Sequence, residues 1–442
     1  MRTFASDDPR QPTDGTTSTR AFIRRQRIIF VVLLFGWLHS LFYVVELPPW
    51  DLLDEEQHLS YVLTLRDERR PPHLNETIQP AIVDSAITTN RWDAFRLTRP
   101  ADVSTSAMMG LEGRSYEAYQ PPLYYSILAI LTIPAGDDVL RILYLARVVG
   151  SLLFVVLLWL TWALACAWFP GQRTIHAGAA LFVAAIPAAA QAGARVSNDL
   201  LAAVLITGAM LALTRFVSCP ILRWGATVGL LAAAGLLTKS HSLIALPVIA
   251  VGLVMLWRNG RLSVRLVGFS VVPSIVAVAG WTLWIYRTYG VLDGTSAYLE
   301  RYQTYQPLPW DIFPRTFWLN AWSDYWGAYG GGDLLVPTNL LLIAIITIGI
   351  VAIARIRAAE TPVSTLFTAI LVVALLTALI YANQAAIVRP SGRLLLPAYP
   401  ALATLIVAGW SRLGAARLVW VPVVAVWLAA LAYIAGWFIP FF

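Results

Sequence analysis

Hydrophobic residues in this chain gather in long runs that are separated by short polar segments. A run of roughly 20 apolar residues is long enough to cross a bilayer as a helix. Eleven runs approach or reach that length, namely 28–47, 145–169, 175–194, 200–217, 224–237, 242–257, 266–286, 336–354, 363–382, 394–410 and 418–438. The pattern therefore predicts an all-α polytopic membrane protein with about 11 transmembrane helices.

The arginines between these runs predict which side each loop faces. Just before the first run stand Arg20, Arg24, Arg25 and Arg27. The apolar stretch 123–134 is too short to cross a bilayer, so we expect it to lie along the outer surface. The arginine-rich loops then all face the cytoplasm, as the positive-inside rule requires. We expect a multi-pass plasma (inner) membrane protein with a cytoplasmic N-terminus.

The composition agrees with a membrane protein and excludes several other features. The chain is 58% hydrophobic and 13% charged, which leaves no room for a sizeable soluble domain. Residues 1–27 begin with a Ser-, Thr-, Pro- and Asp-rich stretch and predict a disordered cytoplasmic tail, with 28–442 as a single transmembrane domain. The pI of about 9.5 reflects loop arginines and not a nucleic-acid partner. Two cysteines, Cys166 and Cys219, make a disulfide framework implausible.

The segment 48–144 becomes a long outer loop, and it opens on a run of acids. In WDLLDEEQHLSYV, three acids stand together at Asp54, Glu55 and Glu56, and His58 follows one helical turn after Asp54. The polar and apolar positions of 54–65 predict an interfacial helix. Ionisable groups at a membrane surface favour a functional site. A solvated helix N-terminus, where acids complement the macrodipole, is the alternative.

A second surface helix is expected at YQPPLYY, residues 119–125, because proline is tolerated in the first helical turn. The loop 287–335 is the other notable outer segment, since it is rich in Tyr and Trp. Such rings stack on sugars. They also form interfacial belts, which explain most of them.

Polar residues at helix ends on the same side form a second group: Arg147, Arg195, Asn198, Asp199, Lys239, His241, Arg389 and Arg393. Lys239 is the only lysine in the chain. Arg389 and Arg393 stand where the positive-inside tendency disfavours cations, so an anionic headgroup is a natural partner. Snorkelling of the arginines to the interface, and helix capping by Asn198 and Asp199, are the alternatives.

Seven fragments together resemble the GT-C superfamily of polytopic glycosyltransferases, with the closest similarity to members related to glycosyltransferase family 39. In order they are WDLLDEEQHLSYV, YQPPLYYSIL, RVVGSLL, RVSNDLLAAVL, GLLTKSHSLIALP, WSDYWGAYGG and SGRLLLPAYPAL, and the resemblance extends from about residue 28 to residue 410. The resemblance implies a first-loop acid pair over a bound polyprenyl-phosphate sugar, at Asp54 and Glu55, and a further acid at Asp199. Relatives often read Asp-Glu-Pro where this chain has Asp-Glu-Glu.

The resemblance implies transfer of a sugar from a polyprenyl-phosphate donor to an extracytoplasmic glycan, lipid or protein acceptor, with inversion at the anomeric carbon. That chemistry needs a base for the acceptor hydroxyl and cations for the departing phosphate. We assign the base to Asp54, with Glu55 orienting it or holding a metal. A divalent ion, Mg²⁺ or Mn²⁺, would be shared by Asp54 and Asp199, although relatives differ in whether they need one.

The remaining candidates are substrate-binding residues: His58, Lys239, Arg389, Arg393, Arg147, Tyr119 and Gln120. Lys239, Arg389 and Arg393 are the main phosphate candidates. A transporter or flippase of a lipid phosphate or glycolipid is the alternative function, because it would also use many spans and outer cations. Transport favours charged residues near the bilayer midplane, whereas here the polar residues gather at one rim. A catalytically inactive scaffold is a third hypothesis.

Overall fold

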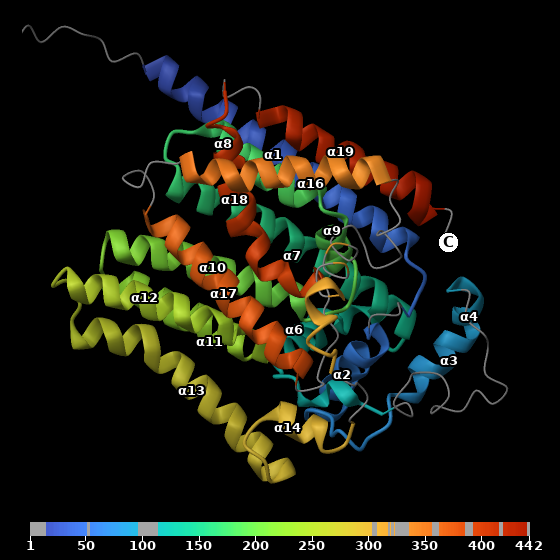
Figure 1. Ribbon diagram of the computed structural model, residues 1–442. Helices are drawn as coiled ribbons and strands as arrows, with labels where there is room; N and C mark the ends of the chain where they lie inside the picture. The colour runs from blue at the N-terminus through green and yellow to red at the C-terminus, as the bar shows by residue number, and fades with distance from the viewer. Residues whose placement is uncertain are drawn as a thin grey trace, which may run out of the picture.

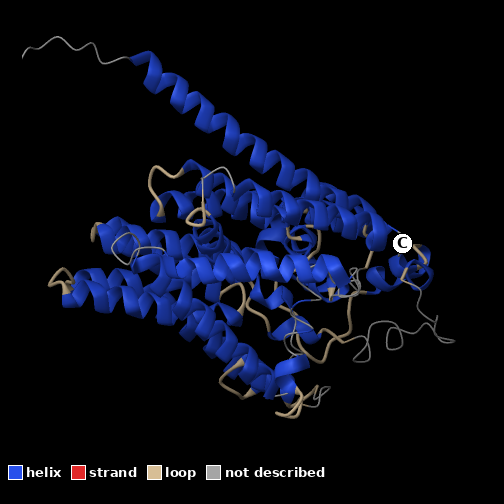
Figure 2. Cartoon of the chain, turned by 45° about the horizontal axis from the view of Figure 1, so that its top comes forward, coloured by secondary structure: helices blue, strands red, loops and turns tan. Residues whose placement is uncertain are grey.

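The computed structural model describes residues 15–50, 54–95, 114–302, 307–316, 319, 322, 336–355, 362–384, 392–414 and 419–439. This part of the chain consists of helices joined by loops, as Figure 2 shows. Its one antiparallel bridge, between Thr77 and Arg114, belongs to no strand. The predicted all-α fold is confirmed.

The helices formed by the apolar runs make up a bundle around one large hydrophobic core (Figure 1). They are α1 (Gly15–Glu46), α7 (Val139–Trp168), α8 (Arg173–Ala185), α9 (Pro187–Gly193), α10 (Asp199–Ser218), α11 (Leu222–Leu236), α12 (Ala245–Arg258), α13 (Val264–Tyr289), α16 (Val336–Ala352), α17 (Pro362–Gln384), α18 (Tyr399–Trp410) and α19 (Trp420–Tyr433).

All eleven predicted runs are mainly helical, but they differ in length. Within the described residues, seven helices are long and apolar enough to cross a membrane, and the bent pair α8 and α9 raises this number to eight. The other three runs form shorter apolar helices, Leu222–Leu236, Leu342–Ile353 and Trp420–Gly436. The chain is a multi-pass membrane protein, and the count of eleven crossings stays a prediction.

The run 175–194, which we expected to be one span, is broken. Ile186 is extended, with φ −74° and ψ 114°, and the axis bends by 73° between α8 and α9. Pro187 explains the break, because proline disfavours the helical conformation of the residue before it. The bend places α9 beside α1 and α7.

The first helix extends into the predicted tail. α1 begins at Gly15, inside the segment 1–27 that was expected to be disordered, and residues 1–14 lie outside the described residues.

Short helices and turns gather at one end of the bundle, at the lower right of Figure 1. They are α2 (Glu55–Glu68), α3 (Pro80–Thr88), α4 (Arg91–Ala94), the 3-10 turn η2 (Tyr116–Tyr119), α6 (Leu123–Leu131), the turn η3 (Ile133–Ala135) and α14 (Gly294–Leu299). At nine residues, α6 is about 14 Å long, too short to cross a bilayer.

We expected α2 to be an interfacial helix, but it lies buried within the protein. Its first ten residues are all buried inside the protein, although three of the first four are charged or can become so. Tyr61 stacks on Tyr125 of α6, with ring centroids 3.8 Å apart. Trp50 and Leu128 belong to the same second hydrophobic core. α2 is covered because segments distant in sequence pack on each of its faces.

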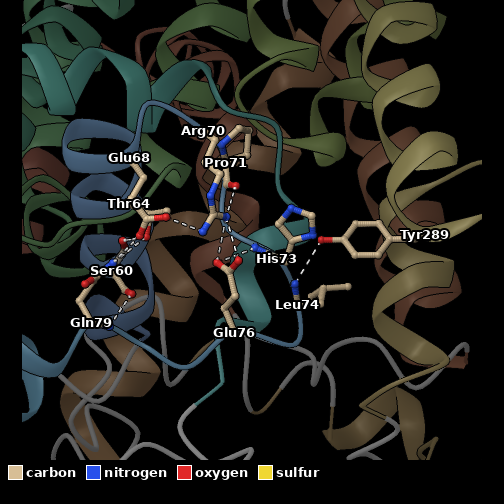
Figure 3. Close-up of polar contacts among 10 residues, drawn as sticks. All are labelled: Ser60, Thr64, Glu68, Arg70, Pro71, His73, Leu74, Glu76, Gln79 and Tyr289. Carbon is tan, nitrogen blue, oxygen red and sulfur yellow. Dashed lines mark hydrogen bonds and ion pairs between the residues drawn. The ribbon is translucent and has the colours of Figure 1, made fainter.

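The segment after α2 ties this helix to α13 (Figure 3). Arg70 donates to Glu76 at 3.1 Å, and the same carboxylate accepts the backbone N–H of His73 at 3.1 Å. The next backbone N–H, that of Leu74, donates to the Tyr289 hydroxyl at 3.1 Å. Gln79 returns to α2 by donating to Ser60. This segment therefore connects the interior of α2 to α13.

Candidate active site

Asp54 stands at the N-terminus of α2 in a left-handed conformation, with φ 67° and ψ 14°. Aspartate is among the few residue types, other than glycine, that adopt this conformation readily. One carboxylate oxygen accepts a hydrogen bond from the Tyr116 hydroxyl, and the other accepts one from Arg393 Nη2 at 3.3 Å. About 29% of the Asp54 side chain is exposed, so it remains open to a ligand.

Arg393 comes from the turn η7 (Gly392–Ala398), 339 residues further along the chain. Its guanidinium has five N–H donors, and Asp54 accepts one of them. Arg393 therefore keeps donor capacity for an anion. Arg389, the other predicted phosphate contact of this segment, lies outside the described residues.

Asp199 and Lys239 form a second ion pair at the same end of the bundle. Asp199 is the first residue of α10, where a negative charge complements the helix dipole. Lys239 precedes the turn η4 (Ser240–Ile244), and its ammonium keeps two N–H donors beyond the one to Asp199. The structure thus pairs the predicted phosphate contact Lys239 with the predicted metal ligand Asp199.

His58 lies beneath these charges. Its Nδ1 is 2.9 Å from the Tyr125 hydroxyl, which also accepts a hydrogen bond from the Asn198 side chain at 3.3 Å. Burial lowers the pKa of His58 to about 4, although Asp54 and Asp199 oppose the shift. A neutral imidazole that links α2, α6 and α10 orients the site at neutral pH.

Glu55 points away from Asp54 and into the protein. Its carboxylate accepts two hydrogen bonds from Arg147, from Nε at 2.9 Å and from Nη2 at 2.6 Å, and neither side chain is exposed. Arg147 also donates to the backbone carbonyls of Leu47 and Pro48. The backbone N–H of Val196 donates to the same carboxylate at 3.2 Å. This arrangement favours a structural role, in contrast to the expected catalytic role of Glu55 and substrate contact of Arg147.

Tyr119 and Gln120 lie in and just after η2. The main chain and ring of Tyr119 pack closely on Gly294 of α14. The Gln120 carbonyl accepts a hydrogen bond from the Tyr61 hydroxyl at 3.2 Å. Both residues hold η2 in place, and their predicted contact with substrate stays a prediction.

The neighbouring residues Tyr116 and Glu117 reach the site but were missed in the sequence. Tyr116 donates to Asp54, and Glu117 is half-buried within electrostatic reach of Asp54, Lys239 and Arg393. The sequence feature that could have indicated them is the acid Glu117, which stands two residues before the YQPPLYY motif, in SYEAYQPP. Its importance depends on η2 folding onto the start of α2.

The arrangement does not suit the expected divalent cation. Asp54 and Asp199 are each already paired with a cation, Arg393 and Lys239, which competes with a metal ion for the carboxylate. The described residues contain no group of three or more His, Cys, Asp or Glu side chains that could hold a metal ion. The metal ligands named above remain a hypothesis.

No protein-family model matches the chain, and no curated protein matches it. Two solved structures of ArnT from Cupriavidus metallidurans are similar to it. The structure bound to undecaprenyl phosphate aligns with a TM-score of 0.55 at 14% identity, over 92% of this chain and 63% of that one. The apo structure aligns with a TM-score of 0.52 at 15% identity, over 90% and 61%.

The chain has the ArnT fold. This agrees with the GT-C resemblance read from the seven sequence fragments, since the resemblance predicted such a fold. The chain spans about three fifths of the length of the ArnT chains that it matches.

Proposed function

We propose that the protein is a membrane glycosyltransferase that moves a sugar from a polyprenyl-phosphate donor to an extracytoplasmic acceptor. One observation carries the proposal: the half-buried carboxylate of Asp54 lies at the same bundle end as two cations with spare donors, Arg393 and Lys239. The ArnT fold supports the donor class, because one ArnT structure holds undecaprenyl phosphate.

The reaction proceeds by one displacement. The acceptor hydroxyl oxygen attacks the anomeric carbon, the bond from that carbon to the phosphate oxygen breaks, and its electron pair leaves with the phosphate. Asp54 takes the acceptor proton, and Arg393 and Lys239 stabilise the charge on the departing phosphate. A single in-line displacement inverts the anomeric carbon. Tyr116 positions the Asp54 carboxylate through its hydrogen bond.

The test compares membranes that contain wild type, Asp54→Asn or Asp137→Asn, supplied with radiolabelled polyprenyl-phosphate sugars. General-base removal typically costs about 10²- to 10⁴-fold in rate, so Asp54→Asn should lose nearly all labelling of the lipid, glycan or protein fraction. Asp137 is fully exposed, and its variant is the matched control. Equal labelling by wild type and Asp54→Asn at equal protein levels removes Asp54 from catalysis. Labelling that never depends on the protein favours the transporter hypothesis instead.

A further inference from the structure

Glu117 lies on the turn that closes over the start of α2. On one side of it, the Tyr116 hydroxyl donates to Asp54, and on the other side Tyr119 packs against Gly294 of α14. These two contacts leave little freedom to the turn. The half-buried Glu117 carboxylate is held near four charged groups that come from different elements, Asp54, Lys239, Arg393 and Asp199.

Glu117 differs from the other two acids of this group in its contacts. Asp54 and Asp199 each have an ion-pair partner. Within the described part of the chain, the Glu117 carboxylate has neither an ion pair nor a hydrogen bond, although it lies near both cations. Three neighbouring tyrosines complete its surroundings: Tyr116, Tyr119 and Tyr125.

The charges of this cluster balance only when Glu117 is neutral. Counting described residues, the carboxylates of Asp54, Asp199 and Glu117 face the cations of Lys239 and Arg393. An ionised Glu117 leaves one excess negative charge. An anionic phosphate that enters this cluster is repelled by that charge, whereas a protonated carboxyl group can donate a hydrogen bond to a phosphate oxygen.

We propose that Glu117 determines recognition of the anionic donor: the phosphodiester binds when the Glu117 carboxyl group is protonated and is rejected when it is ionised. The inference rests on the proposed function for the nature of the donor. The donor then binds together with one proton. Because coupling between two binding events is reciprocal, protonation of Glu117 tightens donor binding by the same factor by which bound donor tightens proton binding.

The electrostatics support this assignment. Burial raises the pKa of Glu117 to about 7, with Asp54 acting in the same direction, while Lys239 and Arg393 oppose the shift. Burial also raises the pKa values of Tyr116 and Tyr119 far above neutral, and His58 is neutral at this pH. Glu117 is therefore protonated below about pH 7, and donor affinity is lost as the pH rises through that value.

The experiment uses a probe whose own charge does not change. The methyl phosphodiester of undecaprenol carries a single negative charge across the range, unlike undecaprenyl phosphate, whose second proton titrates there. Its dissociation constant is measured on the full-length protein in detergent micelles between about pH 6 and pH 8. For one linked proton with a pKa near 7, the wild-type constant should rise about tenfold over that range.

Two variants and one control separate the possible sources of this pH dependence. Glu117→Gln should bind the probe with a constant that no longer depends on pH, and Glu117→Asp should keep a dependence. Glu300→Gln, on an exposed glutamate after α14, should behave as wild type. Glu56 also has a pKa raised to about 7 by burial, but it remains in the Glu117→Gln variant, so a loss of the dependence there is not its effect.

The outcomes distinguish this inference from the proposed function. Binding by wild type that does not change with pH, or an unchanged pH dependence in Glu117→Gln, overturns the role of Glu117 and leaves the transferase proposal standing. Failure of wild type to bind the diester at any pH overturns both. If Glu117→Gln does not elute as a single species, Glu117→Ala takes its place, because it also removes the titrating carboxyl group while Glu56 remains.

Discussion

At the scale of single residues, the acidic run 54–56 divides into three environments. Asp54 is half-buried beside Arg393, Glu55 is enclosed with Arg147, and Glu56 is buried near Arg91 at 3.5 Å. Successive residues of a helix point in directions about 100° apart, so adjacent acids meet different neighbours. The roles of the three acids therefore follow from the packing around α2.

The Glu55–Arg147 pair provides a prediction of stability. Removing one partner of a fully buried ion pair typically costs about 3–5 kcal/mol, because the other charge stays buried without compensation. We expect Glu55→Ala to lower the thermal unfolding temperature in detergent markedly. Glu300→Ala, which removes the exposed partner of the long Arg301–Glu300 contact, should change the stability by less than about 1 kcal/mol.

Activity measurements on Glu55→Gln complete this prediction. If the variant melts like wild type yet transfers no sugar, Glu55 belongs to the catalytic group after all. A parallel loss of folded protein and activity agrees with the structural role.

At the scale of elements, glycines allow α7 and α9 to approach closely. A Cβ atom on Gly150 of α7 would stand 2.6 Å from the carbonyl oxygen of Gly193, at the end of α9. A Cβ on Gly193 would stand 2.6 Å from Ser40 Oγ of α1. Small residues at helix crossings are typical of membrane bundles, since they let backbones come together. The crossing lies one turn from Arg147 and so supports the site.

Gly150→Ala tests this crossing. The added methyl group meets backbone, which cannot turn aside as a flexible side chain can, so we expect a lower unfolding temperature and reduced activity. Gly280→Ala in α13 is the matched control, because nothing lies within 4 Å of its Cβ position. Alanine favours helix by up to about 1 kcal/mol over glycine, so the control should be as stable as wild type or slightly more so. Equal melting of the two variants would argue against a tight crossing.

At the scale of the whole molecule, the charged cluster lies at one end of the bundle. α10 carries Asp199 at its first residue and ends just before the exposed Cys219. Its 20 residues span about 30 Å, close to the thickness of a bilayer core. Cys219 therefore marks the face opposite to the candidate active site.

This geometry makes the orientation in the membrane measurable. In a Cys166→Ser background, we expect a membrane-impermeant maleimide to leave Cys219 unlabelled in intact cells and to label it after permeabilisation. Asp137→Cys, in a variant without native cysteines, should show the reverse pattern, because Asp137 is exposed at the site end of α7. Labelling of Cys219 from outside would invert the orientation predicted from the arginine loops and place the acidic site in the cytoplasm.

Much of the candidate site could be found in the sequence because its members are unusual where they stand. Asp54, Asp199, Lys239 and Arg393 are polar residues at the ends of apolar runs, and such placement is costly without a purpose. Glu117 does not stand at the end of an apolar run, since it lies in a polar stretch of a long loop. The pairings among these residues, such as Arg393 with Asp54, also had no sequence signal, because they join segments hundreds of residues apart.

The sequence alone determined that the protein is helical and crosses a membrane several times, and it indicated which rim holds the ionisable groups. Apolar run length and arginine position are local properties, which a single sequence contains in full. Only the tertiary structure decided that α2 is enclosed, that Glu55 is held by Arg147, and that η2 brings Tyr116 and Glu117 to Asp54. Burial and ion pairing depend on which distant segments meet, and the packing of the folded chain settles that.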